Sequence, residues 1–451
     1  MGAGSGGLSV AAGAAQMGAD VVLLEGHRMG GDCLNTGCVP SKALLAAAKA
    51  AHGDAGPQDY RAAMGHVART IATIAPNDSQ QRFEGLGVRV IRAWGRFVSP
   101  REVAAGDHLI QARRVVIATG SAPLVPPIPG LESVPYLTNE TLFDLRDRPA
   151  HLLIAGGGPI GLEMAQAHIR LGARVTVIEG DRVLGREDPE LAAVVLAQLR
   201  AEGVEVVEGA RIARVSGGAG AIRLETQDGR GFDGSHLLLA LGRRADTARL
   251  DLAVAGIETT ATGIRTDAGL RTSNRRVYAI GDAAGGLQFT HVAGYHAGVV
   301  VRSALFGLPA RATTAHIPRV TYTDPELAQV GLTEAEARAA HGDRLQVVRA
   351  DYADNDRAIA EGQTAGFAKV MVVRGRPVGA AIVGPQAGEL IGIWALALAN
   401  GMKMRAIAGT VLPYPTLGEL NKRVTGAYFS PRLFENQAVK RVVRAVQRYL
   451  P

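Results

Sequence analysis

The sequence has few cysteines, few aromatic residues and no long hydrophobic run, and each shortage excludes a class of protein. No apolar run reaches the roughly 18–20 residues that cross a bilayer. The longest, 391–399, predicts a buried or interface helix. No basic region precedes an apolar stretch at the N-terminus, so we expect a cytoplasmic protein without a secretory signal. With only 4% aromatic residues and arginines spread along the chain, the net charge of +7 indicates a diffuse positive surface and no nucleic-acid site.

The only two cysteines, Cys33 and Cys38, lie five positions apart. A structural disulfide across so short a loop would restrict the unfolded chain little, and cytosolic thiols are normally kept reduced. Isolated thiols are usually inert core residues. Two thiols this close together, beside glycines and a proline, favour a catalytic pair.

What the sequence does contain is a globular composition and an internal repeat. With 451 residues, 47% of them hydrophobic, the chain should form two to four domains. Residues 2–7 and 156–161 both match the spacing G-x-G-x-x-G, and the segments that follow align without a gap at an offset of 154 residues. Each copy predicts a glycine turn, an alanine-rich helix and an apolar strand that ends in a glutamate, Glu25 or Glu179.

This pattern is typical of the dinucleotide-binding βαβ unit. The glycines let backbone N–H groups and a helix N-terminus approach a pyrophosphate, and the acid accepts hydrogen bonds from a ribose hydroxyl. Glycine also permits close helix packing without a ligand, but the duplication disfavours that alternative. A strand, 151–155, precedes the second turn, whereas the first turn starts at Met1 with no strand before it. We therefore predict two dinucleotides, with weak retention of the first.

The segment between the copies, Gly30-Gly31-Asp32-Cys33-Leu34-Asn35-Thr36-Gly37-Cys38-Val39-Pro40-Ser41-Lys42, resembles the active site of the pyridine nucleotide–disulfide oxidoreductases. That family includes glutathione reductase, dihydrolipoamide dehydrogenase and mercuric reductase. The resemblance implies that Cys38 is the thiol beside the flavin, that Cys33 meets substrate, and that Lys42 pairs with Glu163. A helix over 43–51 would lower a thiol pKa through its first turn. A solvated surface pair is the alternative for Lys42 and Glu163.

The family fold implied is α/β, with two Rossmann-like domains, for FAD and NAD(P), and an α+β C-terminal dimerisation domain. The expected FAD domain comprises 1–147, without its first strand, and 266–315; the NAD(P) domain is 148–265 and the dimerisation domain is 316–451. The expected FAD-binding residues are Gly2, Gly4, Ser5, Gly6, Gly7, Glu25, Lys42, Ala118, Thr119, Gly120, Gly281 and Asp282. The expected NAD(P)-binding residues are Gly156, Gly158, Ile160, Gly161, Glu179 and Gly242. No metal site is expected.

Two further features concern the cofactors. Glu179 favours a ribose 2′-hydroxyl and therefore NADH, while the nearby Arg182 leaves NADPH open. A helix beginning at 289–291 should point its N-terminus at the flavin, where it would stabilise negative charge. His291 is interpreted as structural, because nothing beside it in sequence would orient it.

The C-terminal third departs from the best-known family members at one position. Where glutathione reductase and dihydrolipoamide dehydrogenase have H-P-T-x-x-E, this chain has Tyr414-Pro415-Thr416-Leu417-Gly418-Glu419. A phenol has an ordinary pKa of about 10 and cannot replace imidazole as a proton shuttle. A tyrosine here resembles mercuric reductase, but the cysteine pair near the C-terminus of those enzymes is absent. Tyr414 and Glu419 would act on the partner subunit's cysteines, which requires a homodimer.

The function predicted is thus electron transfer from NAD(P)H through FAD and Cys33–Cys38 to a small-molecule disulfide or soft electrophile. Dihydrolipoamide dehydrogenase is the alternative enzyme, and Tyr414 argues against it. A redox-sensing flavoprotein, or a chain unable to hold flavin, are alternatives of other classes. Residues 434–450 predict a basic amphipathic helix. Such a helix can lie on an anionic membrane, but packing against its own domain is the commoner arrangement and the one we expect.

Overall fold

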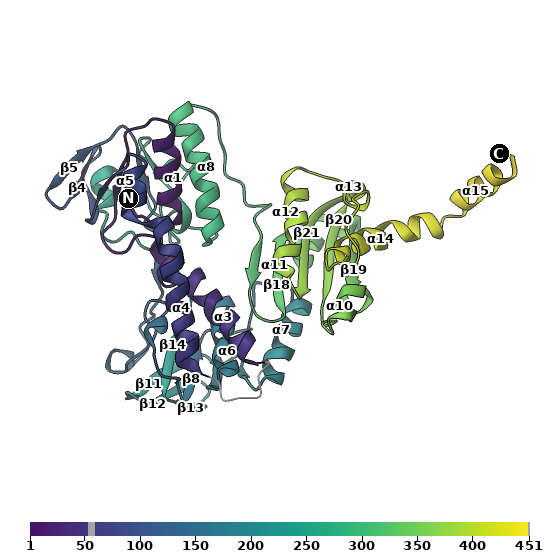
Figure 1. Ribbon diagram of the computed structural model, residues 1–451, viewed down its shortest axis with the longest axis horizontal. Helices are drawn as coiled ribbons and strands as arrows, with labels where there is room; N and C mark the ends of the chain where they lie inside the picture. The colour runs from purple at the N-terminus through teal and green to yellow at the C-terminus, as the bar shows by residue number, and fades with distance from the viewer. Residues whose placement is uncertain (53–58, 450–451) are drawn as a thin grey trace. The chain divides into compact units, whose positions relative to one another are not determined.

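A computed structural model describes residues 1–52 and 59–449 (Figure 1). The chain forms two compact units. Unit 1 comprises 1–181 and 204–313, and unit 2 comprises 182–203 and 314–451. The predicted α/β class, with two dinucleotide-binding βαβ units and a C-terminal α+β domain, is confirmed.

The first half of unit 1 carries short strand pairs covered by helices. Its parallel pairs are β1 with β2 and β6 with β16, and β3, β4 and β5 form an antiparallel sheet. Helices α1 and α8 pack side by side (Figure 1). The elements are α1 (Ser5–Gln16), β1 (Val22–Leu24), α2 (Gly31–Asn35), α3 (Cys38–His52), α4 (Tyr60–Ile74), α5 (Gln80–Gly85), β2 (Arg89–Ile91), β3 (Gly95–Ser99), β4 (Glu102–Ala105), β5 (His108–Gln111), β6 (Val115–Ile117), β16 (Val277–Ala279) and α8 (Thr290–Phe306).

Backbone hydrogen bonds at the start of the chain join the two parallel pairs. Within the described residues no strand precedes α1. The Met1 nitrogen donates to the Val116 carbonyl at 2.8 Å, and the Met1 carbonyl accepts from Ala118 N–H at 2.8 Å. Gly2 N–H donates to the Leu24 carbonyl at 2.9 Å. Met1 and Gly2 therefore lie between β1 and β6, where a central strand of a doubly wound sheet would run.

The second half of unit 1 is built on a four-stranded parallel sheet in the order β10-β9-β8-β14. Strands β8 and β9 are buried along most of their length, because parallel strands are covered on both faces. An antiparallel meander, β11-β12-β13, and the pair β7-β15 complete it. The elements are β7 (Ser121–Pro123), β8 (His151–Ala155), α6 (Pro159–Arg170), β9 (Arg174–Ile178), β10 (Glu205–Val207), β11 (Ile212–Gly218), β12 (Ala221–Thr226), β13 (Gly231–Gly234), β14 (His236–Leu239) and β15 (Arg243–Ala245).

Unit 2 is an antiparallel sheet in the order β17-β18-β21-β20-β19 with helices against it. Trp394, in the expected apolar helix, is fully buried and donates its indole N–H to Asn421 at 2.7 Å. The elements are α7 (Pro189–Ala201), β17 (Arg319–Thr321), β18 (Glu326–Gly331), α9 (Glu334–His341), β19 (Leu345–Asp351), α10 (Asp356–Ala360), β20 (Phe367–Val373), β21 (Arg376–Gly384), α11 (Ala387–Leu390), α12 (Gly392–Ala399), α13 (Met404–Ala408), α14 (Glu419–Phe434) and α15 (Gln437–Tyr449).

Segment 182–203 belongs to unit 2 although it lies between two stretches of unit 1 in the sequence. Its helix α7 packs on β18 and β21. Lys369 of β20, 4% exposed, contacts Asp188 at 2.7 Å, Glu334 at 2.8 Å and Glu190 at 3.2 Å. Because a buried ammonium must be paired, the two acids from the segment, Asp188 and Glu190, help fasten it to unit 2.

The C-terminal helix α15 extends from α14, away from the unit 2 sheet (Figure 1). None of its described residues is buried, and α14 is the element it contacts. The expectation that this helix packs against its own domain is therefore wrong. Val442 and Val446 of its apolar face are 62% and 46% exposed. Leu450, assigned to the same face, lies outside the described residues.

Candidate active site

The two glycine turns have nearly the same geometry. A Cβ on Gly7 would lie 1.9 Å from the Gly2 carbonyl oxygen, and a Cβ on Gly161 would lie 2.1 Å from the Gly156 carbonyl oxygen. Only glycine permits such close approach. A Cβ on Gly158, which caps α6, would meet nothing within 4 Å. Each turn thus holds a helix N-terminus against its own backbone, and the open surroundings of Gly158 leave the α6 N-terminus approachable by a phosphate group.

The glutamates that directly follow β1 and β9 are held alike. Glu25 accepts from Ala3 N–H at 2.7 Å and His27 N–H at 2.6 Å. Glu179 accepts from Gly157 N–H at 2.7 Å and Asp181 N–H at 3.0 Å. Backbone donors therefore fix each carboxylate beside its glycine turn, and its other lone pairs can accept from ribose hydroxyls. The turns and carboxylates together fit two dinucleotides.

The cysteines lie where helix N-termini converge. Cys33 is in α2, and Cys38 is the first residue of α3. Cys38 Sγ lies 3.4 Å from the hydroxyl of Thr290, the first residue of α8. Cys38 is exposed and Cys33 is half-buried. The positive ends of α3 and α8 both favour a thiolate at Cys38.

The two thiols have opposite electrostatic environments. A hydrogen bond from Cys33 lowers the pKa of Cys38 to about 6, against burial, with help from Thr290 and the Lys42 charge. The same hydrogen bond, together with burial, raises the pKa of Cys33. The shared proton therefore stays on Cys33 while Cys38 carries the negative charge. Ser5, at the start of α1, hydrogen-bonds Cys33 and partly offsets the increase.

Lys42 and Glu163 are brought together although they are 121 positions apart. Lys42 Nζ of α3 lies 2.5 Å from Glu163 Oε2 of α6. The Glu163 side chain is 6% exposed and that of Lys42 is 36% exposed, so the pair is partly buried, which favours the functional interpretation over a solvated surface pair. A charge pair between the cysteine helix and the second glycine-turn helix fixes the two halves of unit 1 against each other at the dithiol.

The remaining residues predicted to bind cofactors make the following contacts. Thr119 donates its hydroxyl to the Asp246 carbonyl at 2.7 Å. Gly281 N–H donates to His296 Nδ1 at 3.2 Å. A Cβ would be crowded at Gly6, would make an ordinary contact at Gly4, and would meet nothing nearby at Gly120 and Gly242. Ile160 is exposed at the first turn of α6.

Arg243 is the residue that sequence reasoning missed. Its Nε donates to Ser121 Oγ at 2.7 Å, and its Nη2 donates to the Ser121 carbonyl at 2.7 Å and to Asp32 Oδ2. Ser121 Oγ in turn donates to Asp282 Oδ2 at 2.5 Å. Burial raises the pKa of Asp282. Arg243 thus connects the residue before Cys33 with the expected flavin-binding aspartate, and its position next to Gly242 was the available signal.

Tyr414 and Glu419 lie in unit 2. The Tyr414 hydroxyl is exposed and donates to Asp356 Oδ2 at 2.8 Å, and this hydrogen bond raises the pKa of Tyr414. Arg423 Nη2 contacts Asp356 Oδ1 at 3.2 Å. The buried Oε2 of Glu419 has no hydrogen-bond partner among the described residues. Asp356, which the motif did not indicate, therefore orients the phenol in this chain.

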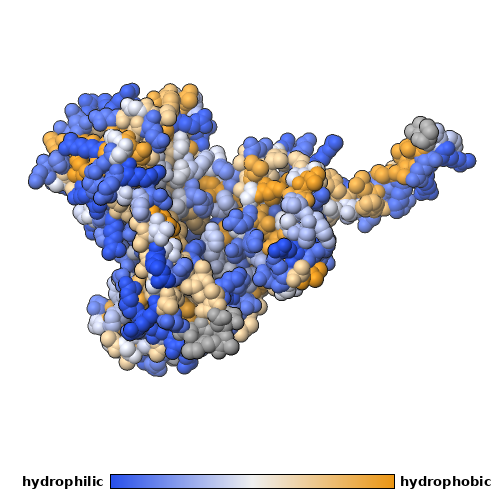
Figure 2. All heavy atoms as spheres, viewed as in Figure 1, coloured by the Kyte–Doolittle hydropathy of each residue, from blue (hydrophilic) through white to orange (hydrophobic). Residues whose placement is uncertain are grey.

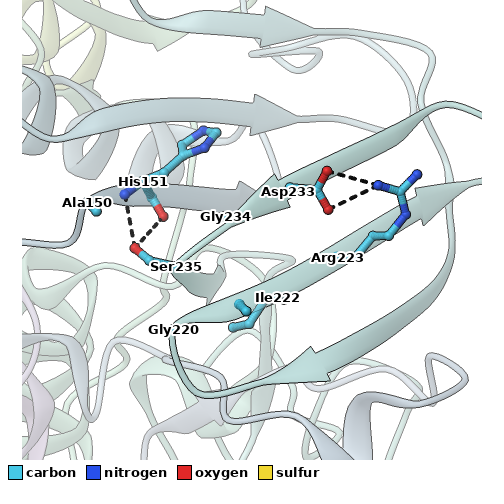
Figure 3. A pocket seen from close by; sticks show the side chains of 9 residues that line it. Ala150, His151, Gly220, Ile222, Arg223, Asp233, Gly234 and Ser235 are labelled. Carbon is cyan, nitrogen blue, oxygen red and sulfur yellow. Dashed lines mark hydrogen bonds and ion pairs between the residues drawn. The ribbon is translucent and has the colours of Figure 1, made fainter.

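A shallow pocket lies at the other end of the second sheet (Figure 3). His151, at the start of β8, and Ser235 line one side, while Arg223 Nη1 contacts Asp233 Oδ2 at 2.9 Å on the other. Nucleotides bind at the carboxyl ends of parallel strands, and this pocket is at the amino end of β8. In the described part of the chain, no cluster of three His, Cys, Asp or Glu side chains is arranged to hold a metal ion, and no helix is long and apolar enough to span a bilayer.

Comparisons with known proteins agree with this arrangement. The family model "Pyridine nucleotide-disulphide oxidoreductase" matches residues 1–297, and its dimerisation domain matches residues 317–424. The mercuric reductase of Acidithiobacillus ferrooxidans is 36% identical over 92% of this chain and 80% of its own length. The dihydrolipoyl dehydrogenase of Bacillus subtilis is 32% identical over 93% of this chain and 95% of its own. The HOCl-induced flavoprotein disulfide reductase RclA of Escherichia coli superimposes with a TM-score of 0.87 at 28% identity, covering 94% of this chain and 98% of RclA.

Proposed function

This chain belongs to the pyridine nucleotide-disulphide oxidoreductase family, and we propose that it passes electrons from NADH to a disulfide or a soft metal electrophile through Cys33–Cys38. It is an FAD-dependent oxidoreductase, and the dimerisation domain indicates a homodimer. The observation that carries the proposal is Cys38, whose thiol lies at two helix N-termini with its pKa lowered to about 6.

The cofactor residues divide between the two turns. FAD would be held by the α1 turn, Glu25, Lys42 and Asp282, and the nicotinamide nucleotide by the α6 turn and Glu179. When bound and reduced, FAD supplies the electron pair that opens the Cys33–Cys38 disulfide. Glu163 would keep Lys42 in place between the two cofactor sites, a contact that its burial supports.

The dithiol then delivers the electron pair. Cys38 stays a thiolate because Thr290 and Cys33 donate hydrogen bonds to it. Cys33 attacks one sulfur of the acceptor disulfide and expels the other, and the Cys33 proton passes to the expelled sulfur. Attack by Cys38 on Cys33 releases the second thiolate and restores the internal disulfide. With a soft metal ion, both sulfurs would coordinate the ion before it is reduced.

The nucleotide preference follows from Glu179. Two backbone N–H groups hold its carboxylate beside the turn, where it can accept from a ribose 2′-hydroxyl and would repel a 2′-phosphate. NADH is therefore proposed over NADPH.

Tyr414 supports the proposed class of acceptor. A raised pKa keeps this phenol protonated at neutral pH, so it can donate a proton or ligate a metal but cannot serve as a base. Contributed with Glu419 across the homodimer, it would complete the partner's dithiol site. Dihydrolipoamide oxidation needs a base there, and relatives named mercuric reductase support the reductive alternative.

The test is steady-state oxidation of NADH and of NADPH by the flavin-loaded protein with disulfides, quinones and Hg(II), with Cys33→Ser as control. We expect NADH to give the higher kcat/KM, and a disulfide or Hg(II) turnover that Cys33→Ser abolishes. Dihydrolipoamide oxidation at the rate of an ordinary dehydrogenase would contradict the proposal, as would acceptor reduction that survives Cys33→Ser.

A further inference from the structure

Helix α15 is the one long helix in unit 2 whose described residues are all at the surface. Residues 431–449 are exposed except Val439, which is half-buried. The apolar side chains Val442 and Val446 are 62% and 46% exposed, and Phe434, just before the helix, is 70% exposed. The dimerisation match ends at residue 424, before this helix begins. Apolar side chains left uncovered over three turns need a binding surface.

The helix separates its residues completely into two faces. At 100° per residue, Val439, Val442, Val443, Val446 and Tyr449, together with Ala438 and Ala445, fall within one half of the helix. The other half holds only glutamines and cations: Gln437, Lys440, Arg441, Arg444, Gln447 and Arg448. Figure 2 shows hydrophobic and hydrophilic residues on opposite sides of this segment.

The charges distinguish between possible binding partners. The helix has four cations and no acidic residue. If α15 paired with the same helix of a second copy, cations would flank the apolar contact on both sides. The helix has no acidic residue that could pair with them. A nucleic acid would neutralise the cations but leave the valines in water. An anionic lipid surface satisfies both faces, because headgroups pair with the cations and the acyl boundary takes up the valines.

We propose that α15 lies flat on an anionic bilayer surface and attaches the enzyme to it. The helix is about 20 Å long, with its apolar face toward the acyl chains and the four cations at headgroup level. Attachment by a single helix with small apolar side chains is weak and reversible. A homodimer presents two such helices, and binding of the first raises the effective concentration of the second. The attachment is independent of the acceptor and of the nucleotide preference.

The test is co-sedimentation of the flavin-loaded full chain with phosphatidylcholine vesicles, with and without one third phosphatidylglycerol. We expect binding only to the anionic vesicles, and weaker binding at raised salt. Arg441→Gln with Arg444→Gln should lower the partition coefficient about fivefold for each cation removed. Val442→Gln with Val446→Gln should lower it about tenfold or more.

Matched controls separate these effects from general surface changes. Val254→Gln removes a valine that is 48% exposed in unit 1, and Arg69→Gln removes an exposed cation from α4. Both should bind like the unchanged protein. Flavin absorbance and circular dichroism confirm that each variant is folded.

Three outcomes would overturn the proposal. The first is no sedimentation with either vesicle, and the second is binding that the paired α15 substitutions leave unchanged. The third is dissociation of the dimer by the valine substitutions in analytical ultracentrifugation, which would assign the apolar face to a second copy.

Discussion

The dithiol region and the Tyr414 region differ in how completely the chain fixes their reactive groups. Cys38 lies at the N-termini of two helices and hydrogen-bonds both Thr290 and Cys33. Tyr414 is 70% exposed, and its hydroxyl bonds one side chain, Asp356. The thiol pKa is lowered to about 6 by contacts within one unit, whereas the phenol pKa is raised by a single hydrogen bond.

This difference separates the step in which the dithiol accepts electrons from the step in which electrons are delivered to the acceptor. Accepting electrons requires a thiolate at a fixed position, which helix ends and a partly buried ion pair provide at low reorganisation cost. Delivering electrons depends on an exposed residue that a single substitution can change. The dithiol is therefore expected to tolerate little variation, while the Tyr414 position can tune the acceptor.

The largest effect should come from Cys38→Ser. Without a thiol to receive the electron pair, NADH-driven disulfide reduction should fall about 10³-fold or more. Reduction of ferricyanide, which takes electrons directly from the flavin, should change by less than about twofold, and stopped-flow assays of both acceptors measure the contrast. An equal loss with both acceptors would show that the substitution damages flavin binding, and the comparison of the two regions would fail.

A second test removes the hydrogen bond that dominates the Cys38 pKa. The thiolate forms as the pH rises through about 6 in the reduced protein. Cys33→Ala removes the donor, so the titration should move to higher pH and the thiolate fraction at neutral pH should fall about tenfold. The pH dependence of the thiolate–flavin charge-transfer absorbance reports it. Cys33→Ser keeps a donor and should titrate near the unchanged protein; an unchanged midpoint in Cys33→Ala would refute the assigned cause.

A third test concerns Arg243. Arg243→Gln leaves Asp32 and Asp282 without their shared cation, so flavin affinity should fall about tenfold. Adding Asp32→Asn removes one of the two negative charges and should restore most of that affinity, measured by flavin fluorescence on dilution. Restoration distinguishes charge neutralisation from packing, because a purely structural role of Arg243 would gain nothing from the second substitution.

The smallest effect should come from Tyr414→Phe. Loss of one exposed hydrogen bond should lower disulfide turnover less than about fivefold. Tyr414→His should instead raise dihydrolipoamide oxidation above the pH at which the imidazole becomes neutral. A 10³-fold loss of disulfide turnover in Tyr414→Phe would show that the Tyr414 region is as important for turnover as the dithiol region.

Sequence reasoning predicted the local turns, strands and helices of this molecule better than the side-chain contacts between distant segments. Glycine turns, the strand 151–155 and the helix over 43–51 follow from short-range patterns of backbone geometry and periodicity, although α3 begins five residues earlier, at Cys38. Asp356 beside Tyr414, and Arg243 beside Asp32, join segments 58 and 211 positions apart. No linear pattern records such contacts, because they depend on tertiary packing. The expectation that α15 packs against its own domain was wrong for a related reason. Amphipathicity shows that a helix has an apolar face but does not show what covers that face.

Residues 182–203 pack in unit 2, and this affects the order in which the parts of unit 2 can fold. During synthesis, α7 emerges long before the sheet on which it packs, so its inner face must wait for residues 314–451. Conversely, residues 314–451 alone would keep Glu334 as a partner of Lys369 but would lack Asp188 and Glu190. The second compact unit of this chain is therefore discontinuous in sequence, and cutting the gene at residue 314 would remove two of the carboxylates that contact Lys369.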